Sequence, residues 1–324
     1  MIKGHGDDAY LYPYITSDFS SNICPRSHEA LTRHLAALPQ LLSHYPEPEP
    51  WSLEALIARR HAIDPRTVIV TAGATDAIYL VAQTFRYRHR IDAPTFSEYD
   101  DACRMFPTTD GSRTCFWLCN PNNPTGTVLD SVDVREIIRR HDLTVIDQSY
   151  EHYTHERLMP PHIALCYGCV IQIHSMTKTY AVPGLRLGYI VAPVRMADAI
   201  RRNMRPWATS TVAVEAGRFL LQHDELMATP DLDEAQRLLS LLRGIDGISV
   251  ADTATNFMLC HIANHSAAEL KDYLARRHAM LIRDASNFPS LTTHHFRVAA
   301  QSPQEDDALV AAIQDFIHAY PAHR

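Results

Sequence analysis

One lysine of this sequence stands where its amine can do covalent chemistry. Lys178 lies in the segment Ser175-Met176-Thr177-Lys178, directly after the apolar run 170–173, whose length and composition predict a buried strand. A lysine that follows a buried strand is poorly solvated, which favours the neutral amine and therefore imine formation with a carbonyl compound. Other groups must accompany this amine before it indicates a cofactor.

An acid and a phenol follow another predicted strand. Asp147 comes directly after the apolar run 143–146, so we expect it at the carboxyl end of a parallel strand, where ligands bind in open α/β sheets. There its carboxylate can keep a pyridine nitrogen protonated, and Tyr150 can donate to a phenolic oxygen. Aspartate is also a preferred helix N-cap, so position 147 taken alone fits a capping role equally well.

Residues 71–75 are suited to binding a phosphate. They lie between a predicted strand and a predicted helix, so Gly73, Ala74 and Thr75 can direct N–H groups and a hydroxyl towards an anion at the helix N-terminus. The G-x-G-x-x-G and G-K-[ST] patterns are missing, which argues against dinucleotide and P-loop binding. An amine, an acid, a phenol and phosphate donors are together what pyridoxal phosphate requires of a protein.

The order of these segments resembles a known family. The run NPNNPTG at residues 120–126 precedes Asp147 and Tyr150, and Lys178 is followed eight residues later by Arg186. In this order the segments resemble the fold-type-I pyridoxal-phosphate enzymes of the class I/II aminotransferase family.

By this resemblance, Lys178, Asp147 and Tyr150 are the catalytic residues. Lys178 would bind the cofactor aldehyde as an imine, Asp147 would pair with the pyridine nitrogen, and Asn123 and Tyr150 would bind the phenolic oxygen. Phe96 would stack on the cofactor ring. The remaining cofactor-binding residues would surround the phosphate: Gly73, Ala74, Thr75, Ser175, Thr177 and Arg186 from the same chain, and Tyr45 from the neighbouring subunit.

Both ends of the chain resemble one group within the family, the threonine-phosphate decarboxylases of cobalamin side-chain synthesis. The matching segments are GHG at residues 4–6, DFSSNICP at 18–25, LIRD at 281–284 and FRVA at 296–299. The resemblance implies recognition of a phosphate and a carboxylate, anions that arginine binds well. The implied substrate-binding residues are His5, Gly6, Asn22, Asn123, Arg283 and Arg297.

The expected activity is decarboxylation of a phosphorylated amino acid, L-threonine O-3-phosphate. Histidinol-phosphate aminotransferases share the core segments, the tyrosine at position 45 and an arginine at position 297, so transamination of a phosphorylated amine is the alternative. A third alternative is a homologue that binds the cofactor without turnover. The residues leave the reaction open, because the bond that breaks is the one held perpendicular to the cofactor ring.

The elements that must position these residues form two units. Short apolar runs alternate with helical stretches at 68–70, 115–118, 143–146 and 170–173, which predicts an α/β domain whose mostly parallel sheet is flanked by helices. From about residue 196 onward, long helical stretches with a few strands predict a smaller α+β domain. The resemblance implies the aspartate-aminotransferase-like fold.

Three segments are therefore expected. An N-terminal arm over residues 1–45 would belong to the small domain and to a dimer contact, a large cofactor-binding domain would cover 46–205, and a small C-terminal domain would cover 206–324. A homodimer follows from the resemblance, because Tyr45 would serve the opposite subunit's site and both sites would lie at a two-fold interface.

Composition limits the classes of partner. The chain has 324 residues and a formal net charge of −7, without the dense basic stripe that attracts nucleic acid. It has no apolar run long enough for a membrane span and no secretory leader, so we expect a cytoplasmic protein. Seven cysteines, an odd number, suggest reduced thiols, and the 19 histidines lack metal-site spacing, so no metal is expected.

Overall fold

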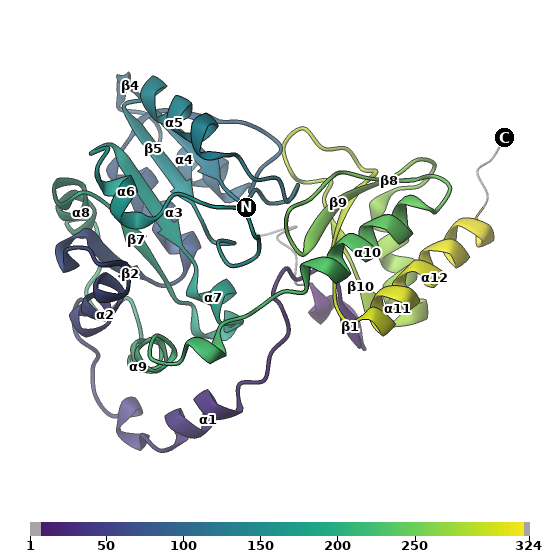
Figure 1. Cartoon of the computed structure of the whole chain (residues 1–324), viewed down its shortest axis with the longest axis horizontal. Helices are drawn as coiled ribbons and strands as arrows, with labels where there is room; N and C mark the ends of the chain where they lie inside the picture. Colours follow the sequence, from purple (N-terminus) through teal and green to yellow (C-terminus); the bar gives the residue numbers. More distant parts are fainter. Residues whose placement is uncertain (1–7, 321–324) are drawn as a thin grey trace.

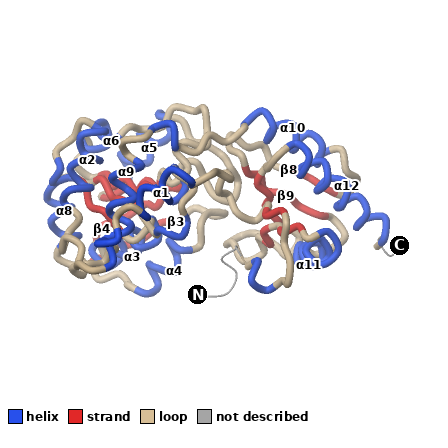
Figure 2. Tube along the Cα trace, turned by 90° about the horizontal axis from the view of Figure 1, so that it is seen from below, coloured by secondary structure: helices blue, strands red, loops and turns tan. Residues whose placement is uncertain are grey.

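The computed structural model describes residues 8–320. These residues form three sheets, and the two with the most strands, each with its own helices, lie side by side along the long axis of the molecule (Figure 1). The larger sheet is formed within residues 68–191 and the smaller within residues 248–299. Figure 2 shows helices on the outer side of the strands in both halves.

The larger sheet has six strands in the order β2-β7-β6-β5-β4-β3. Their bounds are β2 Val68–Thr71, β3 Tyr87–Ile91, β4 Asp110–Cys119, β5 Leu143–Asp147, β6 Val170–His174 and β7 Gly188–Val191. β3, β4, β5 and β6 run parallel, whereas β7 runs antiparallel to both of its neighbours, β6 and β2. The sheet is therefore mixed and mostly parallel, which confirms the predicted fold class.

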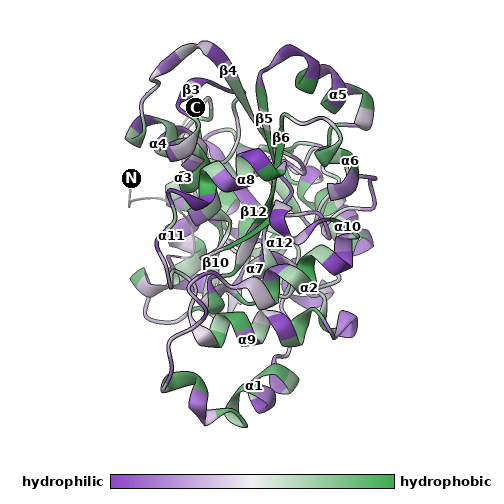
Figure 3. Cartoon of the chain, turned by 90° about the vertical axis from the view of Figure 1, so that its left-hand side faces the viewer, coloured by the Kyte–Doolittle hydropathy of each residue, from purple (hydrophilic) through white to green (hydrophobic). Residues whose placement is uncertain are grey.

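The central strands are apolar on both faces because helices cover both faces. Every residue of β5 and β6 is buried, and these strands are mostly hydrophobic (Figure 3). Successive side chains alternate between two cores, since Val145 packs with α3, α4 and α8 while Ile146 packs with α5 and α6. The helices of this half are α2 Trp51–His61, α3 Ala74–Thr84, α4 Glu98–Met105, α5 Ser131–Arg140, α6 Pro161–Leu165, α7 Met176–Thr179, α8 Val194–Arg201 and α9 Thr211–Leu220.

The smaller sheet is antiparallel, in the order β11-β12-β9-β8. Its strands are β8 Ile248–Val250, β9 Phe257–Ile262, β11 Arg283–Asp284 and β12 His295–Ala299. Three long helices pack on it and form a separate hydrophobic core: α10 Leu232–Arg243, α11 Ala267–His278 and α12 Pro303–Ala319. Ser266 and Ser302 begin α11 and α12 with capping boxes, in which the serine and a glutamate three residues later satisfy each other's backbone N–H groups.

The N-terminal arm contacts both halves. Strand β1, Ser17–Asp18, pairs in parallel with β10, Met280–Leu281, and Phe19 is buried in the core of the smaller half. Farther along, α1, Glu29–Ala36, packs against α9. The domain boundaries at residues 45 and 206 stay predictions, and α9 itself shares its hydrophobic core with α2 and the larger sheet.

Short 3-10 turns complete the connections: η1 Ala9–Leu11, η2 Pro39–Leu42, η3 Pro65–Thr67, η4 Pro183–Leu185 and η5 Asp224–Leu226. None of the helices within residues 8–320 combines the length and the apolar character that a membrane span needs. All seven cysteines are unpaired.

Candidate active site

A cavity of about 260 Å³ lies where the two halves of the molecule meet. Lys178 and Asp147 line it from the larger half, while Arg297 of β12 lines it from the smaller half. The predicted residues that line it are Asn22, Ala74, Thr75, Phe96, Asn123, Asp147, Tyr150, Ser175, Thr177, Lys178, Arg186 and Arg297. Residues predicted from separate segments of the sequence therefore share one cavity.

Lys178 is held at the end of a buried strand. β6 ends at His174, Ser175 follows, and the short helix α7 carries the lysine over the cavity. The Nζ atom lies 5.6 Å from the centre of the Tyr150 ring. The backbone carbonyl of Lys178 accepts a hydrogen bond of 2.9 Å from the Tyr153 hydroxyl, which fixes the lysine's main chain.

Asp147 is a buried carboxylate with neutral hydrogen-bond donors on both oxygens. Its Oδ1 accepts from the backbone N–H and the hydroxyl of Ser149 at 2.8 and 2.5 Å, and its Oδ2 accepts from the Tyr99 hydroxyl at 2.7 Å. Burial raises the pKa of Asp147, and the bonds from Ser149 and Tyr99 act in the opposite direction. The residues after Asp147 form a turn and not a helix, so the capping alternative is wrong.

On the side of the cavity towards the N-terminal arm, buried polar groups meet. The Tyr150 hydroxyl accepts from Asn22 Nδ2 at 3.2 Å, and burial raises the pKa of Tyr150 to about 12. Arg297 donates to Asn123 Oδ1 at 2.5 Å and to the Ser20 carbonyl at 2.6 Å, and burial lowers the pKa of its guanidinium to about 10.

Two buried atoms of this group have no hydrogen-bond partner among residues 8–320: Arg297 Nε and Asn22 Oδ1. A buried polar atom without a partner costs free energy, commonly about 1–3 kcal/mol. Such atoms beside a cavity are available to a bound polar molecule. The Nε atom offers a donor that suits an anion, and the Oδ1 atom offers an acceptor.

The phosphate-binding segment is built from closely packed backbone. Gly73 precedes α3 at a φ of +92°, and a Cβ at this position would lie 2.8 Å from a terminal nitrogen of Arg186. A Cβ on Gly188 of β7 would lie 2.9 Å from the backbone nitrogen of Ala74. The 11-residue α3 directs its positive N-terminal end to the part of the cavity lined by Thr75 and Arg186.

These groups fit pyridoxal phosphate. The cavity offers a primary amine, a buried acid, a phenol, an aromatic ring from Phe96 and, at a helix N-terminus, the donors for a phosphate. The unpartnered Arg297 Nε is one more buried donor beside the cavity. Within the described part of the chain, no group of three or more histidine, cysteine, aspartate or glutamate side chains could hold a metal ion.

Some predicted residues lie apart from the cavity. The Tyr45 side chain is 85% exposed and packs on Trp207, with ring centres 5.5 Å apart. Arg283 is buried next to Arg297 in the β11–β12 pairing and donates to Asn287 Oδ1 at 2.8 Å, but it does not line the cavity. His5 and Gly6 lie outside the described residues.

Several residues that line the cavity were not predicted from the sequence. They are Ser20, Ser21, Ile23, Tyr99, Cys119, Ser149 and Pro183. Tyr99 lies in the first turn of α4, three residues after Phe96, and Ser149 follows Asp147 by two, the spacing of a side-chain turn. Both spacings were available as signals, whereas the approach of residues 20–23 to the cavity depends on the tertiary fold.

Comparison with known proteins agrees with this geometry. The chain is 27% identical to a threonine-phosphate decarboxylase from Salmonella typhimurium, with 93% of this chain and 91% of that protein aligned. The crystal structure of L-threonine-O-3-phosphate decarboxylase from Porphyromonas gingivalis superimposes with a TM-score of 0.89 and 32% identity over 94% of this chain and 100% of that one.

A histidinol-phosphate aminotransferase from Sinorhizobium meliloti, solved in complex with pyridoxal-5'-phosphate, has the same fold. Its TM-score is 0.77 at 17% identity, over 94% of this chain and 92% of that one. The profile of the aminotransferase class I and II family matches residues 106–313, which include Asn123, Asp147, Lys178 and Arg297. On this match, which extends over more than half of its length, the chain belongs to the aminotransferase class I and II family.

Proposed function

We propose that this protein is a pyridoxal-phosphate-dependent enzyme that decarboxylates a phosphorylated amino acid, L-threonine O-3-phosphate. The observation that carries the proposal is the single cavity shared by Lys178, Asp147, Tyr150 and Arg297. When bound, pyridoxal phosphate supplies a conjugated ring that accepts the electron pair released as a bond to the substrate's Cα breaks.

Each cofactor-binding residue has a distinct task in this proposal. Lys178 would hold the cofactor covalently through its amine, and Asp147 would hold a proton on the pyridine nitrogen. Tyr150 and Asn123 would bind the phenolic oxygen, and Phe96 would cover the ring face. The phosphate would bind to Gly73, Ala74, Thr75, Ser175, Thr177 and Arg186, with Tyr45 of a second subunit completing it.

The substrate's two anions would be bound by the arginines and the N-terminal arm. Arg297 stays charged at neutral pH, because the pKa of its guanidinium, although lowered by burial, is still about 10. Its Nε–H group has no partner among residues 8–320 and could donate a hydrogen bond to a carboxylate of the substrate. Asn22 and Arg283, with His5 and Gly6 of the arm, are the other proposed substrate-binding residues.

These contacts would decide which bond breaks. If they hold the carboxylate perpendicular to the cofactor ring, carbon dioxide leaves; if they hold the Cα–H bond there, the Lys178 amine takes the proton and transamination follows. The threonine-phosphate decarboxylases aligned over nearly the whole chain favour the first outcome. The histidinol-phosphate type of aminotransferase is the second candidate, favoured by the shared fold.

The decisive test compares two substrates. The purified protein with pyridoxal phosphate is incubated with L-threonine O-3-phosphate, and separately with histidinol phosphate plus 2-oxoglutarate. We expect carbon dioxide and an aminopropanol phosphate from the first mixture and no glutamate from the second. Glutamate without carbon dioxide would establish the aminotransferase instead, and neither product would favour a homologue that binds the cofactor without turnover.

Lys178→Ala tests the covalent assignment. The chain has only three lysines, Lys3, Lys178 and Lys271, so borohydride reduction followed by peptide mass analysis identifies the modified residue without ambiguity. We expect the modification on Lys178 alone, and a loss of turnover of at least about a thousandfold in Lys178→Ala. Lys271→Ala, which removes an ion pair with Asp8 away from the cavity, is the matched control. Full turnover in Lys178→Ala would contradict both enzymatic assignments.

The proposal includes a homodimer, because Tyr45 and Trp207 are exposed in the single chain and Tyr45 is expected to reach a second subunit's phosphate. It also includes a cytoplasmic location, in keeping with the unpaired cysteines.

A further inference from the structure

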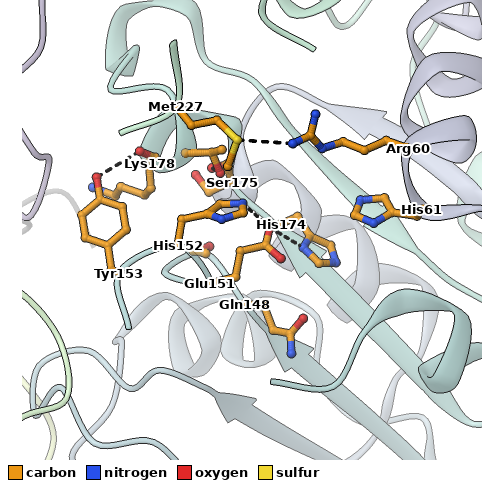
Figure 4. Close-up of polar contacts among 12 residues, drawn as sticks. Arg60, His61, Gln148, Glu151, His152, Tyr153, His174, Ser175, Lys178 and Met227 are labelled. Atoms are coloured by element: carbon orange, nitrogen blue, oxygen red, sulfur yellow. Dashed lines mark hydrogen bonds and ion pairs between the residues drawn. The ribbon is translucent and has the colours of Figure 1, made fainter. Parts of the chain in front are cut away.

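A cluster of imidazoles surrounds one carboxylate behind the segments that carry Tyr150 and Lys178. Glu151 follows Tyr150 directly, and His174 ends β6, four residues before Lys178. His61, at the end of α2, and His152 complete the cluster (Figure 4). None of these four side chains lines the cavity, so they do not belong to the binding site described above.

The orientation of the His174 ring depends on Glu151. The side chain is fully buried, and its Nδ1 lies 2.9 Å from Glu151 Oε1. Its ring stacks on Tyr189 of β7, with centres 4.6 Å apart and planes inclined by 10°. A half-turn about the Cβ–Cγ bond would keep this stack while exchanging Nδ1 with Cδ2, and Nε2 has no hydrogen-bond partner among residues 8–320. The hydrogen bond to Glu151 therefore decides whether Nδ1 or Cδ2 of His174 faces the turn that carries Tyr150.

Glu151 is a charged partner. Burial alone would raise the pKa of this carboxyl, but the charge and hydrogen bond of His174, with smaller contributions from His152 and His61, lower it to about 2. The His152 Nε2 lies 3.7 Å from the same oxygen. The His61 Nε2 lies 2.8 Å from the Tyr189 hydroxyl oxygen. Burial lowers the pKa of His61 to about 4, so His61 is neutral at physiological pH.

The His174–Glu151 hydrogen bond joins the two segments whose relative position sets the distance between Tyr150 and Lys178. One is the turn that follows Asp147 and carries Tyr150; the other is the end of β6 that leads into Ser175 and Lys178. A second bond, from the Tyr153 hydroxyl to the Lys178 carbonyl, joins the same two segments farther along (Figure 4). Together the bonds leave the Lys178 main chain little freedom to move relative to Tyr150.

We infer that Glu151 and His174 are positioning residues, which hold the Lys178 amine at its working distance from Tyr150 and the bound cofactor. The inference rests on the proposed function, since it concerns the same amine. It predicts that breaking the pair slows covalent capture of pyridoxal phosphate by Lys178 without changing any residue that contacts the cofactor.

The experiment measures capture in the absence of any substrate. Wild type, Glu151→Ala and Glu151→Gln are mixed with pyridoxal phosphate, and the visible absorbance of covalently bound cofactor is followed with time and confirmed by borohydride trapping. A displacement of the amine is expected to slow capture by about tenfold or more in Glu151→Ala, since small misplacements have large kinetic costs. Glutamine still offers an oxygen to His174 Nδ1, so Glu151→Gln should recover most of the rate.

The matched control breaks a pair of the same kind elsewhere. His34 Nε2 lies 3.0 Å from Glu215 Oε1, between α1 and α9, and neither residue lines the cavity. Glu215→Ala should capture the cofactor at the wild-type rate. Thermal unfolding of each variant shows how much of it is folded, and rates are expressed per folded chain.

The outcomes separate the two proposals. Slow capture in Glu151→Ala, with recovery in Glu151→Gln and a normal control, supports the positioning role. Equal rates per folded chain in wild type and both Glu151 variants overturn this inference and leave the proposed function standing. If Glu151→Ala does not fold, a folded Glu151→Gln protein whose capture is slowed by about tenfold or more overturns the inference as well, because the hydrogen bond alone should suffice. Failure of wild type to attach the cofactor at Lys178 overturns the proposed function and, with it, this inference.

Discussion

At the scale of single residues, the buried acid of the site is held by neutral donors. Asp147 accepts hydrogen bonds from Ser149 on one oxygen and from Tyr99 on the other. Tyr99 is itself fully buried and stacked on Trp117, with ring centres 5.5 Å apart, so its hydroxyl has a fixed direction. Burial works against the charge of Asp147, and the Tyr99 hydroxyl is one of the groups that preserve it.

Tyr99→Phe should therefore weaken cofactor binding. Losing this donor raises the pKa of Asp147 further, so the carboxylate is less able to hold a protonated pyridine nitrogen. We expect an increase in the Kd for pyridoxal phosphate of about tenfold, the lower end of the value of one hydrogen bond to a charged group. Binding should also be lost at a higher pH than in wild type as the solution is acidified. Fluorescence titration of the apoprotein between pH 5 and 8 measures both effects.

The control for this prediction is Tyr79→Phe. The Tyr79 hydroxyl donates to Glu98 at 2.9 Å, away from the cavity. Its removal should leave the Kd unchanged. Equal Kd values for Tyr99→Phe and wild type at every pH would show that the Tyr99 hydroxyl does not help to maintain the charge of Asp147.

At the scale of elements, the start of α3 and the strand β7 approach each other as closely as backbones allow. A Cβ at Gly188 would lie 2.8 Å from the His174 carbonyl oxygen and 2.9 Å from both Ala74 N and Gly73 C. These are main-chain atoms, so they cannot move aside as a flexible side chain can. The phosphate-binding segment depends on this approach, since β7 supports it from behind.

Gly188→Ala should consequently reduce stability and cofactor binding together. Forcing the backbones apart costs about 1–3 kcal/mol in the free energy of unfolding. It also displaces the Ala74 N–H, so the Kd for pyridoxal phosphate should rise. Urea unfolding and fluorescence titration measure the two effects. Gly111→Ala, where a Cβ meets nothing within 4 Å, is the control, and a Gly188→Ala protein that matches it would refute the argument.

A buried carboxyl group near the start of α12 makes the stability of the protein depend on pH. Asp306 is fully buried, and burial raises its pKa to about 8, assisted by the neighbouring carboxylate of Glu234. The folded state therefore binds a proton here between about pH 4 and pH 8 that the unfolded chain releases. Stability from this group is fully present below pH 4 and is lost as the pH rises towards 8.

Asp306→Asn should abolish that pH dependence. The amide cannot ionise, still accepts from the Gln301 N–H and can donate to Glu234. We expect a gain of about 1–2 kcal/mol in the free energy of unfolding at pH 8 and a smaller gain at pH 5. Urea denaturation at both pH values measures it. Asp307→Asn, which breaks only an exposed pair with Arg237, should change stability at neither pH, and a similar gain there would contradict the explanation.

At the scale of the whole molecule, the site exists only because two halves meet. The amine and the acid come from the larger sheet, whereas Arg297 and the Asn22 segment are held by the smaller half. Tyr45 and Trp207 form an exposed aromatic pair, with ring centres 5.5 Å apart. A second subunit would give this pair a function.

Light scattering should accordingly give a mass of two chains. Tyr45→Ala is expected to raise the Kd for pyridoxal phosphate by about tenfold, the value of one hydrogen bond to a charged group. Because the side chain is exposed, the free energy of unfolding should change by less than about 0.5 kcal/mol. Tyr320→Ala, another exposed aromatic at the end of α12, should have no effect on the Kd. Two results together would contradict the shared site: a wild-type mass of one chain, and a Kd for pyridoxal phosphate in Tyr45→Ala equal to that of wild type.

The sequence by itself determined the elements and the order of the reactive groups. Apolar runs of strand length located β5 and β6. Asp147 ends β5 and Lys178 comes four residues after β6, and the two residues line one cavity because the carboxyl ends of parallel strands gather at one edge of a sheet. The two strands follow from the local hydrophobic pattern, and the positions of Asp147 and Lys178 follow from how few residues separate them from the apolar runs. The family resemblance rested on the same local segments, and the roles of individual site residues stay predictions.

The tertiary structure alone decided the long-range contacts. The direction of β7, antiparallel in a mostly parallel sheet, leaves no local trace, because a strand buried on both faces has the same apolar pattern in either direction. The Tyr99–Asp147 bond spans 48 residues, and the Arg297–Asn123 bond spans 174. The first pair depends on how α4 packs on the larger sheet, and the second forms only when the two halves meet.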